Sequence, residues 1–268
     1  MTYNSRNFPI LNVGMLENVP LTHKEEYWQR VHAATEDDLA AVNYPALPRA
    51  FNRLVDRIFS QAFEEAVSSL VPGRVLEVGC GRARWLRRLE ARGWRTCGLD
   101  IAPASRADAL ASALRLPVAN ESFELAMAIT VLQHIADQKI ALGELIRVTK
   151  SGGRILLIEL LDKPGISWQQ HVMPRSYSWW LAQFRDAGLI IEQEQPVEYL
   201  PLLRFIERIR SGRAVTDSGG SPLKPASSSA LKSSLWNLIT LVSRPLEPLA
   251  RTIAPGSASH RLFLLRKP

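Results

Sequence analysis

From residue 73 onward, short apolar runs alternate with stretches in which apolar positions recur at helical spacing. Residues 74–78 are apolar enough for a central buried strand, and residues 154–161 form the most apolar run. This alternation predicts a parallel sheet covered by helices, an α/β fold. The expected strands are 74–78, 94–100, 108–113, 123–129, 154–161, 189–195 and 260–267, and the expected helices are 83–92, 138–148 and 178–187.

Two segments stand outside this alternating pattern. Residues 1–70 contain the expected helices 24–42 and 48–69, which a proline-containing stretch separates. Residues 199–259 lie between the last two strands and are much longer than a hairpin connection needs. The expected organisation is an N-terminal helical cap (1–70), a core (71–198), a helical insertion (199–259) and a final core strand (260–268).

The positive charge of the chain is concentrated near its C-terminal end. The 268 residues include 33 Lys and Arg against 26 Asp and Glu, a net charge of +7. Residues 196–268 hold 11 basic and 4 acidic groups, whereas residues 1–195 hold 22 of each. Two basic amphipathic segments, near 202–210 and 235–244, flank the Ser-, Gly- and Pro-rich stretch 211–229. Three interpretations stay open: the segments pack on the core, form a lid over an apolar acceptor, or make peripheral membrane contact through 199–257.

Composition excludes several other classes of protein. The longest apolar run near the C-terminal end, 235–242, is far shorter than the roughly 20 residues that a membrane-spanning helix needs. Residues 1–7 are polar and no secretory signal follows them, so we expect a cytoplasmic protein. Cys80 and Cys97 form neither a disulfide framework nor a Cys–His cluster, so we expect no structural metal.

The strongest chemical signal is the segment 77–83, Glu-Val-Gly-Cys-Gly-Arg-Ala, with Asp100 21 positions after Gly79. Glycines after a central strand let backbone amides approach a ligand, and an acid at the tip of the next strand accepts bonds from ribose hydroxyls. The pattern therefore indicates a nucleoside cofactor. A nicotinamide fingerprint would need glycine where Arg84 stands, and no phosphate-binding Gly-Lys-Ser/Thr sequence follows.

These residues resemble the first motif of the class I S-adenosylmethionine-dependent methyltransferases. Further stretches are similar to the small-molecule branch of that family in order and spacing, namely 97–100, 116–125, 131–137 and the Lys-Ser-Gly-Gly turn at 150–153. The resemblance covers about residues 70–195 and the final strand. It implies a Rossmann-like, doubly wound, mostly parallel seven-stranded sheet with helices on both faces, and S-adenosyl-L-methionine as the cofactor.

The resemblance also implies which residues bind the cofactor. Asp100 would hold the ribose, Ile101 would lie against the adenine, and the carbonyl of Ile129 would meet the methionine amino group. Two positions depart from the family pattern, because Ala83 replaces the third glycine and Ser112 replaces an aspartate that usually holds the adenine amino group. We expect the Cys80 thiol to pack under the loop rather than act as a nucleophile. The full expected set is Glu77, Gly79, Cys80, Gly81, Asp100, Ile101, Ser112, Ala113 and Ile129.

A catalytic base is needed when the methyl acceptor is a hydroxyl group, because the hydroxyl loses its proton as the new bond forms. His134 is the first candidate, since it follows the fourth strand at the edge where open α/β sheets bind ligands, and a packing role for it stays open. His171 and Tyr177 form a second catalytic candidate group. Beside them, Arg175 and Trp168 are candidates for acceptor binding, with Arg175 pairing an acidic group.

We therefore expect a methyltransferase that acts on a small molecule, such as a natural product, a sugar or a lipid-linked acceptor, and that methylates oxygen. Two alternatives are methyltransferases with other acceptors, either a lipid or polyprenyl-linked glycan at the membrane surface or an RNA. A third alternative is a non-catalytic protein that senses the cofactor. No nucleic-acid partner is expected, because residues 128–131 lack the Asn/Asp-Pro-Pro-aromatic motif of enzymes that methylate base amino groups. The arginines at 84, 88, 92 and 95 are interpreted as an exposed helix face next to Glu90.

Overall fold

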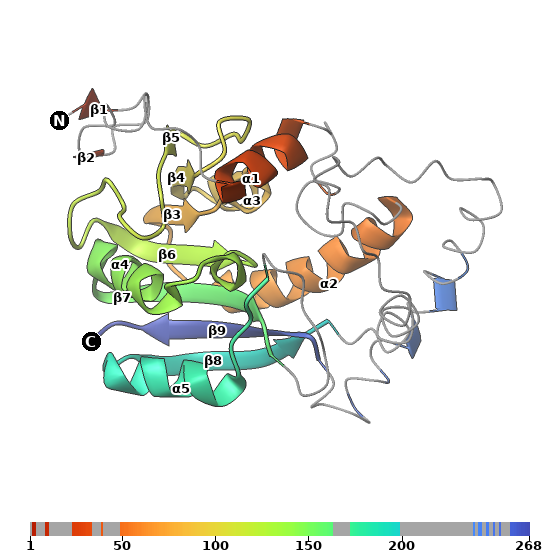
Figure 1. Ribbon diagram of the computed structural model, residues 1–268. Coiled ribbons are helices and arrows are strands. Elements are labelled where there is room, and N and C mark those ends of the chain that lie inside the picture. The colour runs from red at the N-terminus through yellow and green to blue at the C-terminus, as the bar shows by residue number, and fades with distance from the viewer. Residues whose placement is uncertain are drawn as a thin grey trace.

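The computed structural model contains a seven-stranded sheet with helices packed against it (Figure 1). It describes residues 2–3, 9–10, 23–33, 39, 49–162, 172–198 and 258–268, and the isolated positions 238, 241–242, 245–246, 249 and 252. Most of the expected insertion, residues 199–259, therefore lies outside the described residues, and so do the three interpretations of its basic segments.

The strands follow the order β5-β4-β3-β6-β7-β9-β8 across the sheet. Neighbours pair in parallel except at β9, which is antiparallel to both β7 and β8. The arrow of β9 in Figure 1 accordingly points opposite to those of β6 and β8. The strands are β3 (Arg74–Val78), β4 (Arg95–Asp100), β5 (Ala109–Leu110), β6 (Phe123–Ile129), β7 (Thr149–Leu160), β8 (Ile190–Val197) and β9 (His260–Arg266).

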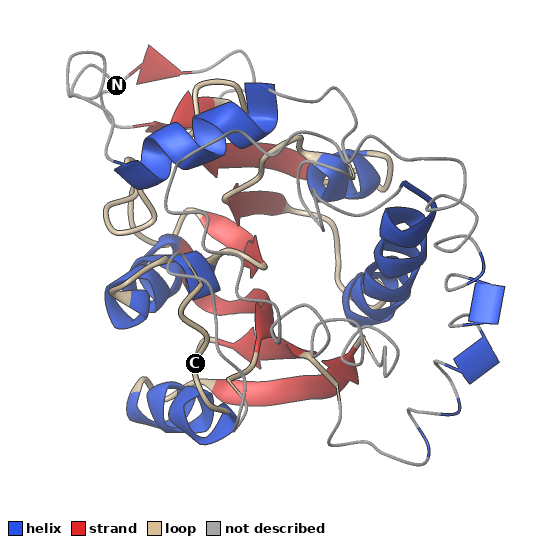
Figure 2. Ribbon diagram, turned by 45° about the vertical axis from the view of Figure 1, so that its right-hand side comes forward, coloured by secondary structure: helices blue, strands red, loops and turns tan. Residues whose placement is uncertain are grey.

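Helices cover both faces of the sheet, as Figure 2 shows. Buried side chains of α4 and α5 pack on one face, and those of α2 and α3 pack on the other. The expected doubly wound α/β architecture with a mostly parallel seven-stranded sheet is confirmed. The helices are α1 (His23–Ala33), α2 (Arg49–Val67), α3 (Arg84–Glu90), the 3-10 turn η1 (Leu132–His134), α4 (Gln138–Val148) and α5 (Tyr177–Asp186), and a separate antiparallel pair joins β1 (Thr2–Tyr3) to β2 (Pro9–Ile10).

Most element boundaries agree with the apolar pattern, and β3, β6 and α4 have the expected bounds. The third strand is shorter than expected, because only Ala109 and Leu110 pair with β4. The expected turn at 150–153 does not separate α4 from the next strand, because these residues lie within β7. There the register with β6 jumps from a pair at Thr149 to one at Arg154, so the intervening residues bulge, with Gly152 at a φ of +73°.

The arginines of α3 correct another expectation. Arg84 is only 7% exposed, and its guanidinium pairs with Asp56 of α2. The next arginines along the helix also reach α2, where Arg88 pairs with Asp56 at 3.4 Å and Arg92 pairs with Glu64. Arg84 is therefore buried against α2 and Arg88 is half-buried, whereas Arg92 and Arg95 are exposed as expected, with Arg95 on β4. A sequence pattern of arginines at helical spacing does not distinguish these cases, because the carboxylates lie on a distant helix.

Of the expected helices before the sheet, the second ends at Val67, two residues earlier than expected. The first is described as His23–Ala33, and most of its expected continuation to residue 42 lies outside the described residues.

Among the helices that the structure describes, none is long and apolar enough to cross a membrane. Within the same described ranges, no group of three or more His, Cys, Asp or Glu side chains is arranged to hold a metal ion.

Candidate active site

The carboxyl ends of β3, β4 and β6 meet at one edge of the sheet because these neighbours are parallel. The glycine loop, residues 79–83, follows β3 at this edge. Gly79, Gly81 and Ala83 have positive φ angles of 69°, 49° and 56°. A side chain at Gly79 would clash, because its Cβ would lie 2.5 Å from Cγ2 of Val131. The loop is therefore packed against the segment that follows β6.

Asp100 ends β4 beside this loop and is 6% exposed. Its Oδ2 accepts a hydrogen bond from the backbone N–H of Gly81, and its Oδ1 accepts one from Ala102, both at 2.8 Å. Each oxygen of a carboxylate has two lone pairs, so these two bonds leave acceptor capacity on both oxygens. This carboxylate fits a ligand that offers two neighbouring hydroxyl groups, as a ribose does.

Glu77 lies near the end of β3, beneath the glycine loop, and is 2% exposed. Burial raises the pKa of its carboxyl well above the usual range, against the opposing charge of Arg84. No hydrogen-bond donor among the described residues reaches Oε2 of Glu77. An unpaired buried carboxyl oxygen is unfavourable unless a ligand supplies a donor. The methionine amino group of S-adenosylmethionine is a donor of the right kind for this place.

The other expected cofactor residues lie on the strands and loops next to this edge. Ile129 ends β6 and is 5% exposed. Ile101 follows β4 directly and is half-buried. Ser112 and Ala113 follow β5, and Oγ of Ser112 accepts a hydrogen bond from the N–H of Leu114 at 3.3 Å. The described edge therefore brings the expected set together.

Cys80 has the packing environment expected for it. The side chain is 4% exposed, and its Sγ would lie 2.8 Å from a Cβ placed on Gly98 of the neighbouring strand. Burial raises the pKa of the thiol, which disfavours the thiolate that a nucleophile needs.

His134 ends η1, directly after β6, and is half-buried. Its ring packs edge-on against Trp28 of α1, with centroids 4.9 Å apart. The Oε1 of Gln133 accepts a hydrogen bond from the N–H of Leu160 at 3.0 Å, so the amide NH₂ of Gln133 faces Nε2 of His134 at 3.4 Å. A donor at that distance favours the tautomer in which Nε2 carries the lone pair.

Glu159 of β7 is a buried residue that the sequence reasoning missed. Its side chain has no exposed surface. Oε1 accepts hydrogen bonds from the N–H groups of Val131 and Leu132 at 3.3 and 3.0 Å, and Oε2 accepts one from Gln133 at 3.0 Å. This carboxyl holds the turn that carries His134. A single acidic residue inside the most apolar strand was the signal in the sequence.

Helix α1 lies across the same edge and contacts its loops. Besides the ring contact of Trp28 with η1, Oε1 of Gln29 accepts a hydrogen bond from the N–H of Ala104, after β4, at 2.7 Å. The guanidinium of Arg82 in the glycine loop donates to the backbone carbonyl of His32. α1 therefore contacts the loops that follow β3, β4 and β6. Its residues were not among the expected site residues.

The second catalytic candidate group is only partly described, because Trp168 and His171 lie outside the described residues. The guanidinium of Arg175 donates to the carbonyl of Ala136 at 3.2 Å, which places Arg175 beside the segment after η1. The hydroxyl of Tyr177 donates to the carboxylate of Glu194 on β8, and this carboxylate also pairs with Arg261. Of this group, Arg175 thus lies near the turn of His134, whereas Tyr177 is engaged at the β8–β9 side of the sheet.

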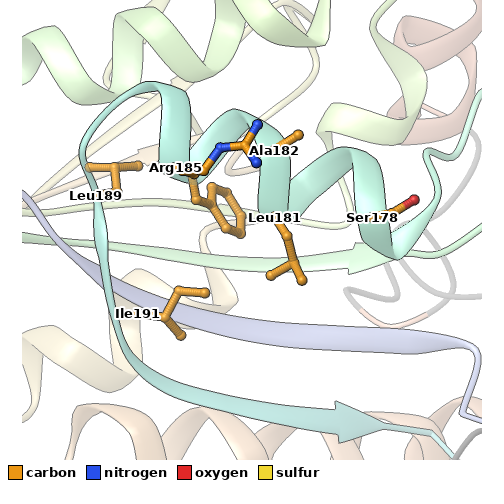
Figure 3. A pocket seen from close by; sticks show the side chains of 7 residues that line it. Ser178, Leu181, Ala182, Arg185, Leu189 and Ile191 are labelled. Carbon is orange, nitrogen blue, oxygen red and sulfur yellow. The ribbon is translucent and has the colours of Figure 1, made fainter.

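A pocket of about 480 Å³ lies elsewhere, between α5 and the start of β8. Figure 3 shows Leu181 of α5 and Ile191 of β8 in the space between these two elements. The pocket is mainly apolar, and its lining includes none of the expected site residues. It is therefore separate from the edge that carries Asp100.

Comparison with known proteins agrees with this geometry. Residues 76–157 match the family described as "Methyltransferase domain". A malonyl-[acyl-carrier protein] O-methyltransferase of Serratia marcescens is 30% identical over 152 residues, which are 48% of this chain and 60% of that protein. A ubiquinone biosynthesis O-methyltransferase of Alkalilimnicola ehrlichii is 23% identical over 173 residues, which are 52% of this chain and 69% of that protein. The match to the first of these relatives thus spans less than two thirds of its length.

Solved structures share the fold over more of the chain. The geranyl diphosphate C-methyltransferase of Streptomyces coelicolor, in complex with geranyl diphosphate and S-adenosyl-L-homocysteine, aligns with a TM-score of 0.57 and 15% identity. The alignment covers 93% of this chain and 100% of that one. Residues 76–157 therefore belong to the methyltransferase domain family, and the chain around them has the fold of the class I S-adenosylmethionine-dependent methyltransferases.

Proposed function

We propose that this chain is an S-adenosylmethionine-dependent methyltransferase that methylates an oxygen atom of a small-molecule acceptor. The observation that carries the proposal is the arrangement at the sheet edge, where the buried Asp100 carboxylate beside the glycine loop lies at the same edge as His134. The domain match and the relatives named O-methyltransferases support the same reaction class.

S-adenosylmethionine supplies an electrophilic methyl group when it is bound. The task of the chain is then to hold the acceptor in line with that methyl group and to exclude water. Asp100 accepts the ribose hydroxyls, and the orphan oxygen of Glu77 receives the amino group. The acceptor hydroxyl replaces the Gln133 amide at the lone pair of His134 Nε2, which then takes the hydroxyl proton as the bond to carbon forms. Arg175 is positioned near the same turn to pair an acidic acceptor group.

The test is turnover of the cofactor in the presence of an acceptor. The purified chain is incubated with methyl-deuterated S-adenosylmethionine and cell extract, and both S-adenosylhomocysteine and deuterated products are followed by mass spectrometry. Fragmentation of the labelled product identifies the methylated atom. Binding of the cofactor without turnover in any extract would instead indicate a cofactor-sensing protein, and a label on nitrogen or carbon would refute O-methylation.

A lipid-linked or polyprenyl-linked acceptor at a membrane surface is the second candidate. The observation that favours it is the excess of 11 basic over 4 acidic groups in residues 196–268. Co-sedimentation with anionic vesicles at low salt, lost at high salt, is the expected result for this candidate. Full turnover on a water-soluble acceptor without any sedimentation would rule it out.

A further inference from the structure

His32 of α1 is a buried polar residue for which no role in the fold is evident. Its side chain is 3% exposed, and no hydrogen-bond partner among the described residues reaches Nδ1. Its ring lies 6.3 Å from that of Trp28, in a tilted arrangement. A buried ring nitrogen without a hydrogen bond is unfavourable, so a group that binds there would be stabilising.

Contacts with the loops at the sheet edge hold His32 in place. The guanidinium of Arg82, in the glycine loop, donates to the His32 carbonyl at the end of α1, where a positive charge is favourable. Oε1 of Gln29, three residues earlier, accepts a hydrogen bond from the N–H of Ala104 in the loop after β4. The loops that border the Asp100 carboxylate on both sides therefore hold this part of α1.

The His32 ring also interacts electrostatically with Asp100. Burial lowers the pKa of His32, Asp100 raises it and Arg82 lowers it, and the net direction is downward. The ring is thus neutral near pH 7 and has one N–H donor and one acceptor nitrogen. Asp100 can only accept hydrogen bonds, so a ribose hydroxyl that donates to it keeps free lone pairs on its own oxygen.

We propose that His32 is a cofactor-binding residue whose Nδ1 donates to a ribose hydroxyl that Asp100 holds from the other side. This inference rests on the proposed function, because it assumes that the edge binds S-adenosylmethionine. It adds to the core motif a residue from α1, outside the matched residues 76–157. The ribose is then recognised both as a donor and as an acceptor, and binding it fixes α1 over the edge.

The experiment measures affinity for S-adenosylhomocysteine by calorimetry, with its 2′-deoxy and 3′-deoxy analogues as further probes. His32→Leu removes the ring nitrogen at similar volume and should weaken binding of S-adenosylhomocysteine about tenfold, the equivalent of one hydrogen bond. For the deoxy analogue that lacks the bonded hydroxyl, wild type and His32→Leu should bind with nearly equal affinity. That dependence on one hydroxyl separates a binding role from a structural one.

Two further variants keep the test decisive. His32→Asn places an amide atom where Nδ1 stands and should retain affinity, whereas His32→Gln moves the amide one bond away and should not. Gln29→Ala, the matched control, loosens α1 without removing the ribose contact and should affect all three probes equally.

An equal loss with all three probes in His32→Leu, or affinity within twofold of wild type, would overturn the inference. If His32→Leu does not unfold cooperatively, the contrast between His32→Asn and His32→Gln decides it. Absence of any S-adenosylhomocysteine binding by the wild type would overturn the proposed function as well.

Discussion

The buried carboxyl of Glu159 should make the stability of this protein depend on pH in a characteristic direction. Burial raises its pKa from 4.5 to about 8, although three backbone N–H groups donate to it. Between these values the folded chain holds a proton that the unfolded chain has released. The free energy of unfolding must then fall as pH rises through this range, by about 1.4 kcal/mol per pH unit.

Glu159→Gln removes this titration at nearly the same side-chain size. Its amide has one acceptor oxygen instead of two, so weaker bonds to the turn at 131–133 should add an offset of about 1–3 kcal/mol that does not change with pH. The informative quantity is therefore the slope. Between about pH 5.5 and pH 7.5, the free energy of unfolding of the wild type should fall by about 3 kcal/mol more than that of the variant.

Urea unfolding followed by circular dichroism and by tryptophan fluorescence measures this slope, and coincident transitions check that unfolding is two-state. Glu144→Gln is the matched control. Hydrogen bonds from Arg147 lower the pKa of Glu144, so this carboxyl is ionised in both states above about pH 5.5 and its contribution should be constant there. Parallel pH profiles for wild type and Glu159→Gln would refute the reasoning, because they would mean that the N–H donors outweigh burial and keep Glu159 ionised.

Three further outcomes are expected. Gly79→Ala should abolish cofactor binding, measured by calorimetry, and lower the melting temperature. A Cβ at the positive φ of this position costs about 1–2 kcal/mol, and it would also clash with Val131. Unchanged binding would contradict the described loop. Asp100→Ala should weaken S-adenosylhomocysteine binding by about 1.5–3 kcal/mol, and unaltered affinity would remove Asp100 from the site. His134→Ala should lower turnover by roughly 10²–10⁴ at unchanged cofactor affinity, whereas normal turnover would leave His134 with a packing role.

The architecture of this protein and the glycine loop at its sheet edge could be predicted from the sequence alone. Apolar runs such as β3 and β6 could be located because a strand buried on both faces needs nearly continuous apolar residues, whatever its partners are. The glycine loop and Asp100 were evident for a similar reason. A backbone with positive φ that packs closely selects glycine, and the acid must follow the next strand at a fixed distance along the chain.

Contacts between segments far apart in the sequence showed which further residues lie at this edge. Glu159 binds the turn before His134 from another strand, and α1 reaches the edge from a segment whose sequence shows no motif. The burial of Arg84 and Arg88 was missed for the same reason, since their carboxylate partner, Asp56, lies some 30 residues earlier on α2. The spacing of residues along the chain predicts the conformation of one segment. The role of a buried charge, or of an unpaired ring nitrogen such as Nδ1 of His32, depends instead on the groups packed around it, which come from other segments.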